Sequence, residues 1–344
     1  MTDVTRLNCL VTGGAGYVGS HVVRLLRARG VRVTVVDNLY SGHRWAVGDA
    51  RLVEADVGDR ARLDALLASE RFDALLHFAA HIWVGESVRD PGKYYRNNTA
   101  NVAFLFDLAA RHGVAHVVFS STAAVYGAAA GPLIDERAPL APIAPYGTSK
   151  MMAERILTDV AAAAGQGTAI LRYFNVAGAH DDGTLGEATP HNSHLVKVAC
   201  EAALGLRPAL TINGDDYPTP DGTCVRDYIH VQDLAAAHVA ALERLLDDSS
   251  PLVVNCGYGH GFSVREVVQA FTRVTGIDLA PEVGPRRPGD PPVLVADNRR
   301  ILSELNWRPE HDDLERIIAS AWAWEQRLQA MRRQMGSRAR PAMV

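Results

Sequence analysis

The chain has 344 residues, 48% of them apolar and 22% charged, which is ordinary for a soluble globular protein. Its formal net charge of −4 argues against a nucleic-acid binder. No apolar run approaches the ~20 residues that span a bilayer, and the amino terminus lacks the pattern of a signal peptide. The four cysteines are scattered without a C-x-x-C spacing, so we expect a cytoplasmic protein with neither disulfides nor a metal site.

The first half of the chain alternates short apolar, β-branched runs with amphipathic stretches. This alternation predicts parallel strands joined by right-handed helical crossovers, and hence a doubly wound, Rossmann-type α/β sheet. A further apolar run near 252–256 is expected to rejoin that sheet. The earlier strands are expected at 7–12, 31–36, 51–54, 74–79, 116–121 and 168–173.

The character of the sequence changes after about Asn175. Segments 178–194 and 208–224 are rich in Gly, Pro, Asp and His, and long loops of this kind in a compact domain are usually functional. We therefore expect a first domain over 1–175 and a smaller, interleaved lobe mainly over 176–330. Residues 331–344 contain little apolar content and are expected to be a disordered tail.

A glycine-rich turn, Gly13-Gly-Ala-Gly16-Tyr-Val-Gly19, stands between the first expected strand and the first helix. Glycines at these spacings allow a tight turn, a close approach of the backbone to a pyrophosphate and close packing of helix on strand. The free N–H groups of the following helix favour the same anion. Because a strand precedes the turn and a helix follows it, the motif predicts dinucleotide binding.

Asp37 ends the second expected strand, 18 residues after Gly19. A carboxylate at this position accepts hydrogen bonds from the adenosine ribose diol and repels a 2′-phosphate. The residues that follow it, Asn38, Leu39 and Tyr40, include no base that would attract NADP. The sequence therefore predicts NAD as the cofactor.

Tyr146 and Lys150 stand four residues apart at the start of an expected helix, so they share one helix face. Tyrosine ionises near pH ~10, and a neighbouring ammonium and a cationic nicotinamide would lower that pKa toward neutrality. A tyrosine tuned in this way suits proton transfer to and from a sugar hydroxyl. Ser121 or Thr122, at the end of the fifth expected strand, could supply a hydroxyl to the same substrate oxygen.

Further motifs run from about residue 7 to residue 325. They include His77-Phe-Ala-Ala, Tyr94-Tyr-Arg-Asn-Asn98, Phe119-Ser-Ser-Thr, Val225-Arg-Asp-Tyr-Ile-His and Arg286-Arg-Pro-Gly-Asp290. On these motifs the chain resembles the extended short-chain dehydrogenase/reductase family, and within it the UDP-glucose 4-epimerases. The resemblance implies reversible, NAD-dependent inversion at C4 of a UDP-hexose through a 4-keto intermediate, with hydride passing to and from bound NAD. It also implies a homodimer that pairs helices near 99–112 and 151–164.

The same resemblance implies a role for individual residues. Tyr146 would be the acid–base group, Lys150 would bind the nicotinamide ribose and tune Tyr146, and Thr122 would hold the sugar 4-oxygen. NAD would be contacted by Gly13, Gly16, Tyr17, Val18, Gly19, Asp37, Asn38, Asp56, Val57, Phe78, Ala79, Ala80, Asn97 and Phe174. The UDP-sugar would be held by Asn175, His194, Leu195, Asn213, Arg226, Arg287 and Asp290.

Three positions depart from the pattern of the family that the chain resembles, and they leave the identity of the sugar undecided. Ile82 stands where many members have Lys, Asn213 where an aromatic residue faces the uracil, and Leu294 where some members have a large Tyr. The alternative reading is a 4-epimerase of another UDP sugar, such as an N-acetylhexosamine, a pentose or a uronate. A remoter alternative is a non-catalytic, NAD-sensing protein. A 4,6-dehydratase is disfavoured because Ala123 and Ala124 replace its Asp-Glu pair.

Overall fold

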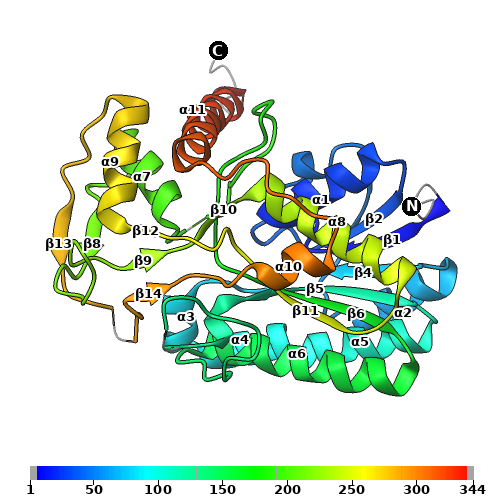
Figure 1. The fold of residues 1–344 in the computed structure, drawn as a ribbon. Helices are drawn as coiled ribbons and strands as arrows, with labels where there is room; N and C mark the ends of the chain where they lie inside the picture. Colours follow the sequence, from blue (N-terminus) through cyan, green and yellow to red (C-terminus); the bar gives the residue numbers. More distant parts are fainter. Residues whose placement is uncertain (1–5, 129–130, 191, 288, 339–344) are drawn as a thin grey trace, which may run out of the picture.

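A parallel sheet of seven strands forms the centre of the computed structural model, which describes residues 6–128, 131–190, 192–287 and 289–338 (Figure 1). The strand order is β11-β6-β5-β4-β1-β2-β3, and every neighbouring pair is parallel. The order reverses between β1 and β4, which is where doubly wound sheets bind their ligands. The strands are β1 (Asn8–Thr12), β2 (Arg32–Asp37), β3 (Arg51–Glu54), β4 (Ala74–His77), β5 (His116–Thr122), β6 (Gly167–Tyr173) and β11 (Leu252–Cys256).

Helices cover both faces of the sheet because the central strands are apolar on both sides. Along β1, Cys9 and Val11 face one hydrophobic core, and Leu10 faces the other. The first core is closed by α1 (Tyr17–Ala28) and α8 (Val231–Asp247), and the second by α2 (Arg60–Ser69), α5 (Asn101–Arg111) and α6 (Pro145–Ala164). Figure 1 shows these two helical layers on opposite sides of the sheet.

A smaller lobe stands beyond the carboxyl ends of the strands, at the left of Figure 1. It is built from three small sheets, in which β10 pairs with β7, β9 lies between β12 and β14, and β13 pairs with β8. Its strands are β7 (Asn175–Ala177), β8 (Thr211–Asn213), β9 (Val225–Arg226), β10 (Tyr228–His230), β12 (Phe262–Ser263), β13 (Glu282–Gly284) and β14 (Val293–Leu294). Its helices α7 (Leu195–Ala203) and α9 (Val264–Thr275) pack against α11 (Leu314–Arg338).

Three short helices complete the fold: α3 (Val84–Arg89), α4 (Pro91–Tyr95) and α10 (Arg299–Glu304). The strand expected near 252–256 is β11, which pairs with β6 at one edge of the central sheet. None of the helices within the described ranges is long and apolar enough to cross a membrane.

The carboxyl-terminal segment differs from the sequence prediction. Helix α11 continues through residues 331–338, a segment that the sequence predicts to be part of a disordered tail. The helix is anchored upstream by the buried side chains of Trp324 and Leu328, and each added helical residue gains one backbone hydrogen bond. Residues 339–344 lie outside the described part of the chain.

Candidate active site

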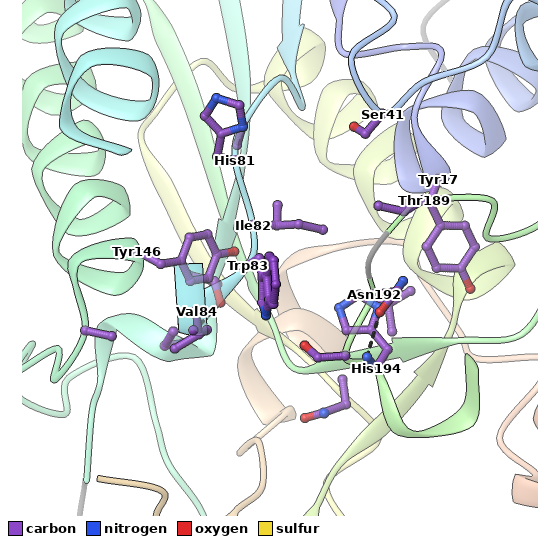
Figure 2. Close-up of a pocket in the computed structure, with 18 of the residues that line it drawn as sticks. Tyr17, Ser41, His81, Ile82, Trp83, Val84, Tyr146, Thr189, Asn192 and His194 are labelled. Carbon is purple, nitrogen blue, oxygen red and sulfur yellow. Dashed lines mark hydrogen bonds between the residues drawn. The ribbon is translucent and has the colours of Figure 1, made fainter. Parts of the chain in front are cut away.

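One cavity of about 1080 Å³ lies where the carboxyl ends of β1, β2, β4 and β5 meet the smaller lobe. Figure 2 shows side chains from distant parts of the sequence, such as Tyr17, Trp83, Tyr146 and His194, around this one space. Most of the predicted site residues line it: Gly13, Gly16, Tyr17, Val18, Gly19, Asp37, Asn38, Val57, Phe78, Ala79, Ala80, Asn97, Thr122, Tyr146, Phe174, Asn175, His194, Leu195, Asn213, Arg226, Arg287 and Asp290.

The glycine turn can adopt its shape only because Gly13 and Gly19 lack side chains. A Cβ at Gly13 would lie 2.4 Å from the backbone nitrogen of Ala79, and one at Gly19 would lie 2.3 Å from the carbonyl oxygen of Gly13. Gly13 also has a φ of +72°, which side chains disfavour. Helix α1 starts directly after Gly16 with neither a side-chain cap nor an acidic residue in its first turn. Its first N–H groups are therefore available to an anion in the cavity.

The carboxylate of Asp37 is fixed at the end of β2 by backbone donors. The amide of Ala15 donates to its Oδ2 at 3.0 Å, and the amide of Leu39 donates to its Oδ1 at 2.8 Å. Burial raises the pKa of Asp37, and these two amides oppose that rise. Its position on the cavity wall, near the glycine turn, suits recognition of a ribose diol.

Two predicted site residues, Asp56 and Lys150, are not among the residues that line the cavity. Asp56 accepts a hydrogen bond of 2.7 Å from the Asn38 side chain and another of 2.7 Å from the Gly58 amide. Asp56 thus contacts Asn38, which does line the cavity. Lys150 is buried one turn after Tyr146 on α6, and its ammonium donates to the carbonyl oxygen of Ser120 at 2.8 Å.

Tyr146 is the second residue of α6, directly after Pro145, and its side chain is buried where it lines the cavity. Burial raises the pKa of the phenol above its usual range, Tyr173 adds to this rise, and a hydrogen bond with Thr122 opposes it. Burial also lowers the pKa of Lys150 to about 7, against the opposing influence of Glu154. The site thus places two hydrogen-bonded hydroxyls at the cavity, and the buried amine of Lys150, one helical turn after Tyr146, has a pKa close to neutrality.

The two arginines expected to bind a diphosphate differ in their surroundings. Arg226 is buried, and its guanidinium forms an ion pair with Asp290. Arg287 lines the same region of the cavity and is exposed. Asp290 therefore orients Arg226, whereas Arg287 is open to solvent. Among the described residues, no group of three or more His, Cys, Asp and Glu side chains could hold a metal ion.

Sequence reasoning missed several residues that line the cavity. They are Tyr40, Ser41, Glu187, Thr189, Asn192 and Arg207. Tyr40 and Ser41 follow Asp37 closely, so extending that motif by a few residues would have found them. Glu187, Thr189 and Asn192 lie in the long loop between β7 and α7, where the sequence shows no periodicity that would indicate which side chains turn inward.

The comparisons with known proteins agree with this arrangement. Residues 9–257 match the NAD dependent epimerase/dehydratase family. Over 340 residues, the chain is 52% identical to the UDP-glucose 4-epimerase of Azospirillum brasilense, covering 98% of each protein. It is similar to the crystal structure of UDP-glucose 4-epimerase from Brucella ovis in complex with NAD, with a TM-score of 0.89, 45% identity, and coverage of 92% of this chain and 97% of that one.

A second similar structure is that of the UDP-Glc/GlcNAc 4-epimerase from Campylobacter jejuni. It has a TM-score of 0.83 and 47% identity, and the match covers 93% of this chain and 99% of that one. The family match spans the central sheet from the second residue of β1 to the end of β11. The chain therefore belongs to the NAD dependent epimerase/dehydratase family.

Proposed function

We propose that this protein is an isomerase that inverts C4 of a UDP-hexose, converting UDP-galactose and UDP-glucose into each other with tightly bound NAD. One observation carries the proposal: a single cavity holds the Tyr146 hydroxyl beside Thr122, with the glycine turn at one end and Arg226 and Arg287 at the other. The 52% identity to a UDP-glucose 4-epimerase over nearly the full length supports the same activity.

The dinucleotide end of the cavity fits NAD. Its glycines leave a cradle that any Cβ at Gly13 or Gly19 would fill, and the uncapped start of α1 offers N–H donors to a pyrophosphate. Asp37 would bind the adenosine ribose, Asp56 would act through Asn38, and Lys150 would bind the nicotinamide ribose. When bound, NAD supplies the acceptance and return of a hydride that turns the C4 alcohol into a ketone and back.

Tyr146 holds and moves the proton at the sugar 4-oxygen. Its phenol takes the proton of the 4-hydroxyl when the ketone forms and returns a proton to the same oxygen when the alcohol is restored. Because burial favours the neutral phenol, the neighbouring Lys150 ammonium is needed to stabilise the phenolate. Thr122 keeps the 4-oxygen within reach of Tyr146.

The smaller lobe holds the part of the substrate that does not react. Arg226 and Arg287 bind the diphosphate through charge-assisted hydrogen bonds, and Asn175, His194, Leu195, Asn213 and Asp290 complete that site. Because UDP stays bound, the flat 4-keto sugar can turn its other face toward the site without leaving. Residues 1–175 with β11 then form the NAD-binding domain, and 176–330 mainly form the UDP-sugar lobe.

The protein is further proposed to be a cytoplasmic homodimer. All four cysteines are unpaired thiols, which suits a reducing compartment. Helices α5 and α6 lie side by side on one outer layer (Figure 1), and the Met152 side chain of α6 is 41% exposed there. Light scattering on the purified protein should give about twice the chain mass of 37.1 kDa, and Met152→Asp should reduce that mass toward the monomer.

The activity is tested with purified protein and UDP-galactose, without added NAD. Formation of UDP-glucose up to an equilibrium mixture is expected, since the cofactor is retained and regenerated. Tyr146→Phe should bind UDP as the wild type does and lose turnover by roughly 10²-fold or more. Wild-type turnover by this variant would remove Tyr146 as the base, and a folded, NAD-containing protein inactive on every UDP sugar would favour a non-catalytic NAD sensor.

A second candidate, a 4-epimerase of a different UDP sugar, is favoured by one observation. Leu294 lines the cavity at the position where a larger Tyr would narrow it, and the Campylobacter jejuni relative is named for both UDP-Glc and UDP-GlcNAc. The same assay run with UDP-N-acetylglucosamine, UDP-arabinose and UDP-glucuronate separates the candidates. The largest kcat/KM identifies the substrate.

A further inference from the structure

A buried carboxylate, that of Glu187, supports the cavity wall on the side of the smaller lobe. Its Oε1 contacts Nδ1 of His194 at 2.7 Å and also accepts a hydrogen bond from the Asn192 side chain. Glu187 is 7% exposed, whereas the His194 side chain is 38% exposed. Both residues line the cavity. The buried carboxylate of Glu187 is therefore in contact with an imidazole that a substrate in the cavity can reach.

The position of Glu187 is fixed from two helices. Its carbonyl oxygen accepts a hydrogen bond of 3.0 Å from the Lys197 ammonium on α7 and another of 3.0 Å from the Trp324 indole on α11. The Asn192 side-chain oxygen also accepts a bond of 2.6 Å from the His194 amide, drawn as a dashed line in Figure 2. The backbone on both sides of the pair is thus held in place.

These contacts decide which ring nitrogen can meet a ligand. Nδ1 of His194 is occupied by Glu187, and within the described residues Nε2 has no hydrogen-bond partner. His194 is also the N-cap residue of the nine-residue helix α7, which begins at Leu195. Nε2 and the N-terminal amides of α7 therefore offer donors to the same part of the cavity, an arrangement that suits an anionic oxygen.

The charges around Glu187 and His194 favour a protonated His194 imidazole. Three carboxylates, those of Glu187, Glu201 and Glu325, share this region with two permanent cations, Lys197 and Arg207. Lys197 pairs with both Glu201 and Glu325, and Arg207 pairs with Glu201. The third carboxylate, that of Glu187, is paired with His194. If His194 is an imidazolium, the cluster has no net charge, which is the state that burial favours.

The pKa shifts of Glu187 and His194 agree with an ion pair of carboxylate and imidazolium. Burial alone would raise the pKa of Glu187, yet it is lowered overall by its contact with His194, with Lys197 and Asn192 contributing. Burial would likewise lower the pKa of His194, yet Glu187 raises it above its usual range. From α1, the neutral phenol of Tyr17 faces the same carboxylate.

We propose that Glu187 is a positioning residue for substrate binding, which holds His194 as an imidazolium with Nε2 directed at the diphosphate of the UDP-sugar. The inference rests on the proposed function, because that function supplies the diphosphate. Glu187 touches no substrate atom in this arrangement. Its effect on binding passes entirely through the charge and orientation of His194.

The test is the dissociation constant of UDP-glucose, measured by calorimetry from pH 5.5 to 8.5. Each phosphate of UDP-glucose carries one ester and one anhydride linkage and a single strongly acidic hydroxyl, so the charge of the ligand does not change over this range. In the wild type, Kd should stay constant until pH exceeds the ordinary histidine pKa of ~6.5, and then rise by roughly tenfold as His194 loses its proton. In Glu187→Gln the amide still accepts from Nδ1 but carries no charge, so the rise should move to lower pH.

Three further variants leave Glu187 unchanged: two test the charge on His194, and the third is a control. His194→Gln should bind weakly at every pH, His194→Lys should bind tightly at every pH, and Glu282→Gln, an exposed carboxylate on β13, should match the wild type. The pH profile of kcat should be unchanged in Glu187→Gln, since Tyr146 carries the proton at C4.

The possible outcomes distinguish a failure of this inference from a failure of the proposed function. An active wild type whose Kd does not change with pH overturns the role of His194 alone. The same midpoint in Glu187→Gln and wild type overturns the role of Glu187. A wild type that binds no UDP-glucose overturns both the inference and the proposed function.

Discussion

The ammonium of Lys150 and the carbonyl oxygen of Ser120 are joined by a hydrogen bond of 2.8 Å, which ties the start of α6 to the end of β5. The same ammonium lies 4.7 Å from the centre of the Phe119 ring. One turn further along α6, the Glu154 carboxylate contacts both Ser121 and Arg172. The segment that carries Tyr146 is thus fixed to the strand that carries Thr122, which sets the distance between the two hydroxyls.

Replacing Lys150 by Met should lower kcat at neutral pH by roughly 10²-fold and change KM for UDP-galactose little. The ammonium that stabilises the phenolate is lost, whereas the diphosphate site of the smaller lobe is untouched. Steady-state kinetics measure both constants. Arg155→Met, on an exposed position of the same helix, serves as the matched control. A K150M enzyme with normal kcat would show that Tyr146 ionises without this neighbour.

Removing the hydroxyl of Thr122 should change the pH dependence of catalysis. The hydrogen bond from Thr122 lowers the pKa of Tyr146, so its loss in Thr122→Val raises that pKa. The phenolate then forms only at higher pH, and the rising limb of the kcat profile should shift to the alkaline side. Thr122→Ser keeps a hydroxyl and should keep the wild-type profile. Identical profiles for the Val and Ser variants would contradict this role.

The Asp37 carboxylate should decide between NAD and NADP. In Asp37→Asn the negative charge that repels a 2′-phosphate is absent, so the protein is expected to carry NADP as well as NAD and to bind NAD roughly tenfold more weakly. Chromatography of the cofactor released by acid from the purified variants measures the ratio. Asp49→Asn, which changes an exposed carboxylate, is the control. Exclusive retention of NAD by D37N would assign the selectivity to other residues.

Narrowing the cavity at β14 should distinguish sugars by size. Leu294→Tyr adds bulk at a lining position, so the inhibition constant of UDP-N-acetylglucosamine should rise by roughly tenfold or more while UDP-galactose kinetics stay within about threefold. Val293→Tyr places the same ring on the neighbouring residue of the strand, which does not line the cavity. Equal effects of the two substitutions would show that position 294 does not bound the sugar site.

The sequence predicted the central sheet well because its strands are continuous apolar runs that are buried on both faces. The fourth strand is shorter than predicted, since Phe78 and Ala79 leave the ladder after His77 and line the cavity instead. Local composition could not indicate this change, because an apolar residue suits a strand and a cofactor pocket equally.

The candidate site was predictable where it depends on local motifs and unpredictable where it depends on contacts across the chain. The glycine turn, Asp37 and Tyr146 each carry their signal within a few residues. The ion pair of Glu187 with His194 depends instead on how one long loop folds back on itself, and its support comes from Trp324 on α11. The helical state of 331–338 likewise depends on an anchor upstream of the segment.

The pairing of β11 with β6 has a consequence for the order in which the molecule can assemble. Some eighty residues separate these two adjacent strands in sequence, and nearly all of the segment between them belongs to the smaller lobe and α8. A nascent chain that ends before Leu252 leaves the edge of β6 unpaired, and such an edge promotes association with other chains. Synthesis must pass Cys256 before the sheet is complete, so the nucleotide-binding half cannot mature ahead of the lobe inserted within it.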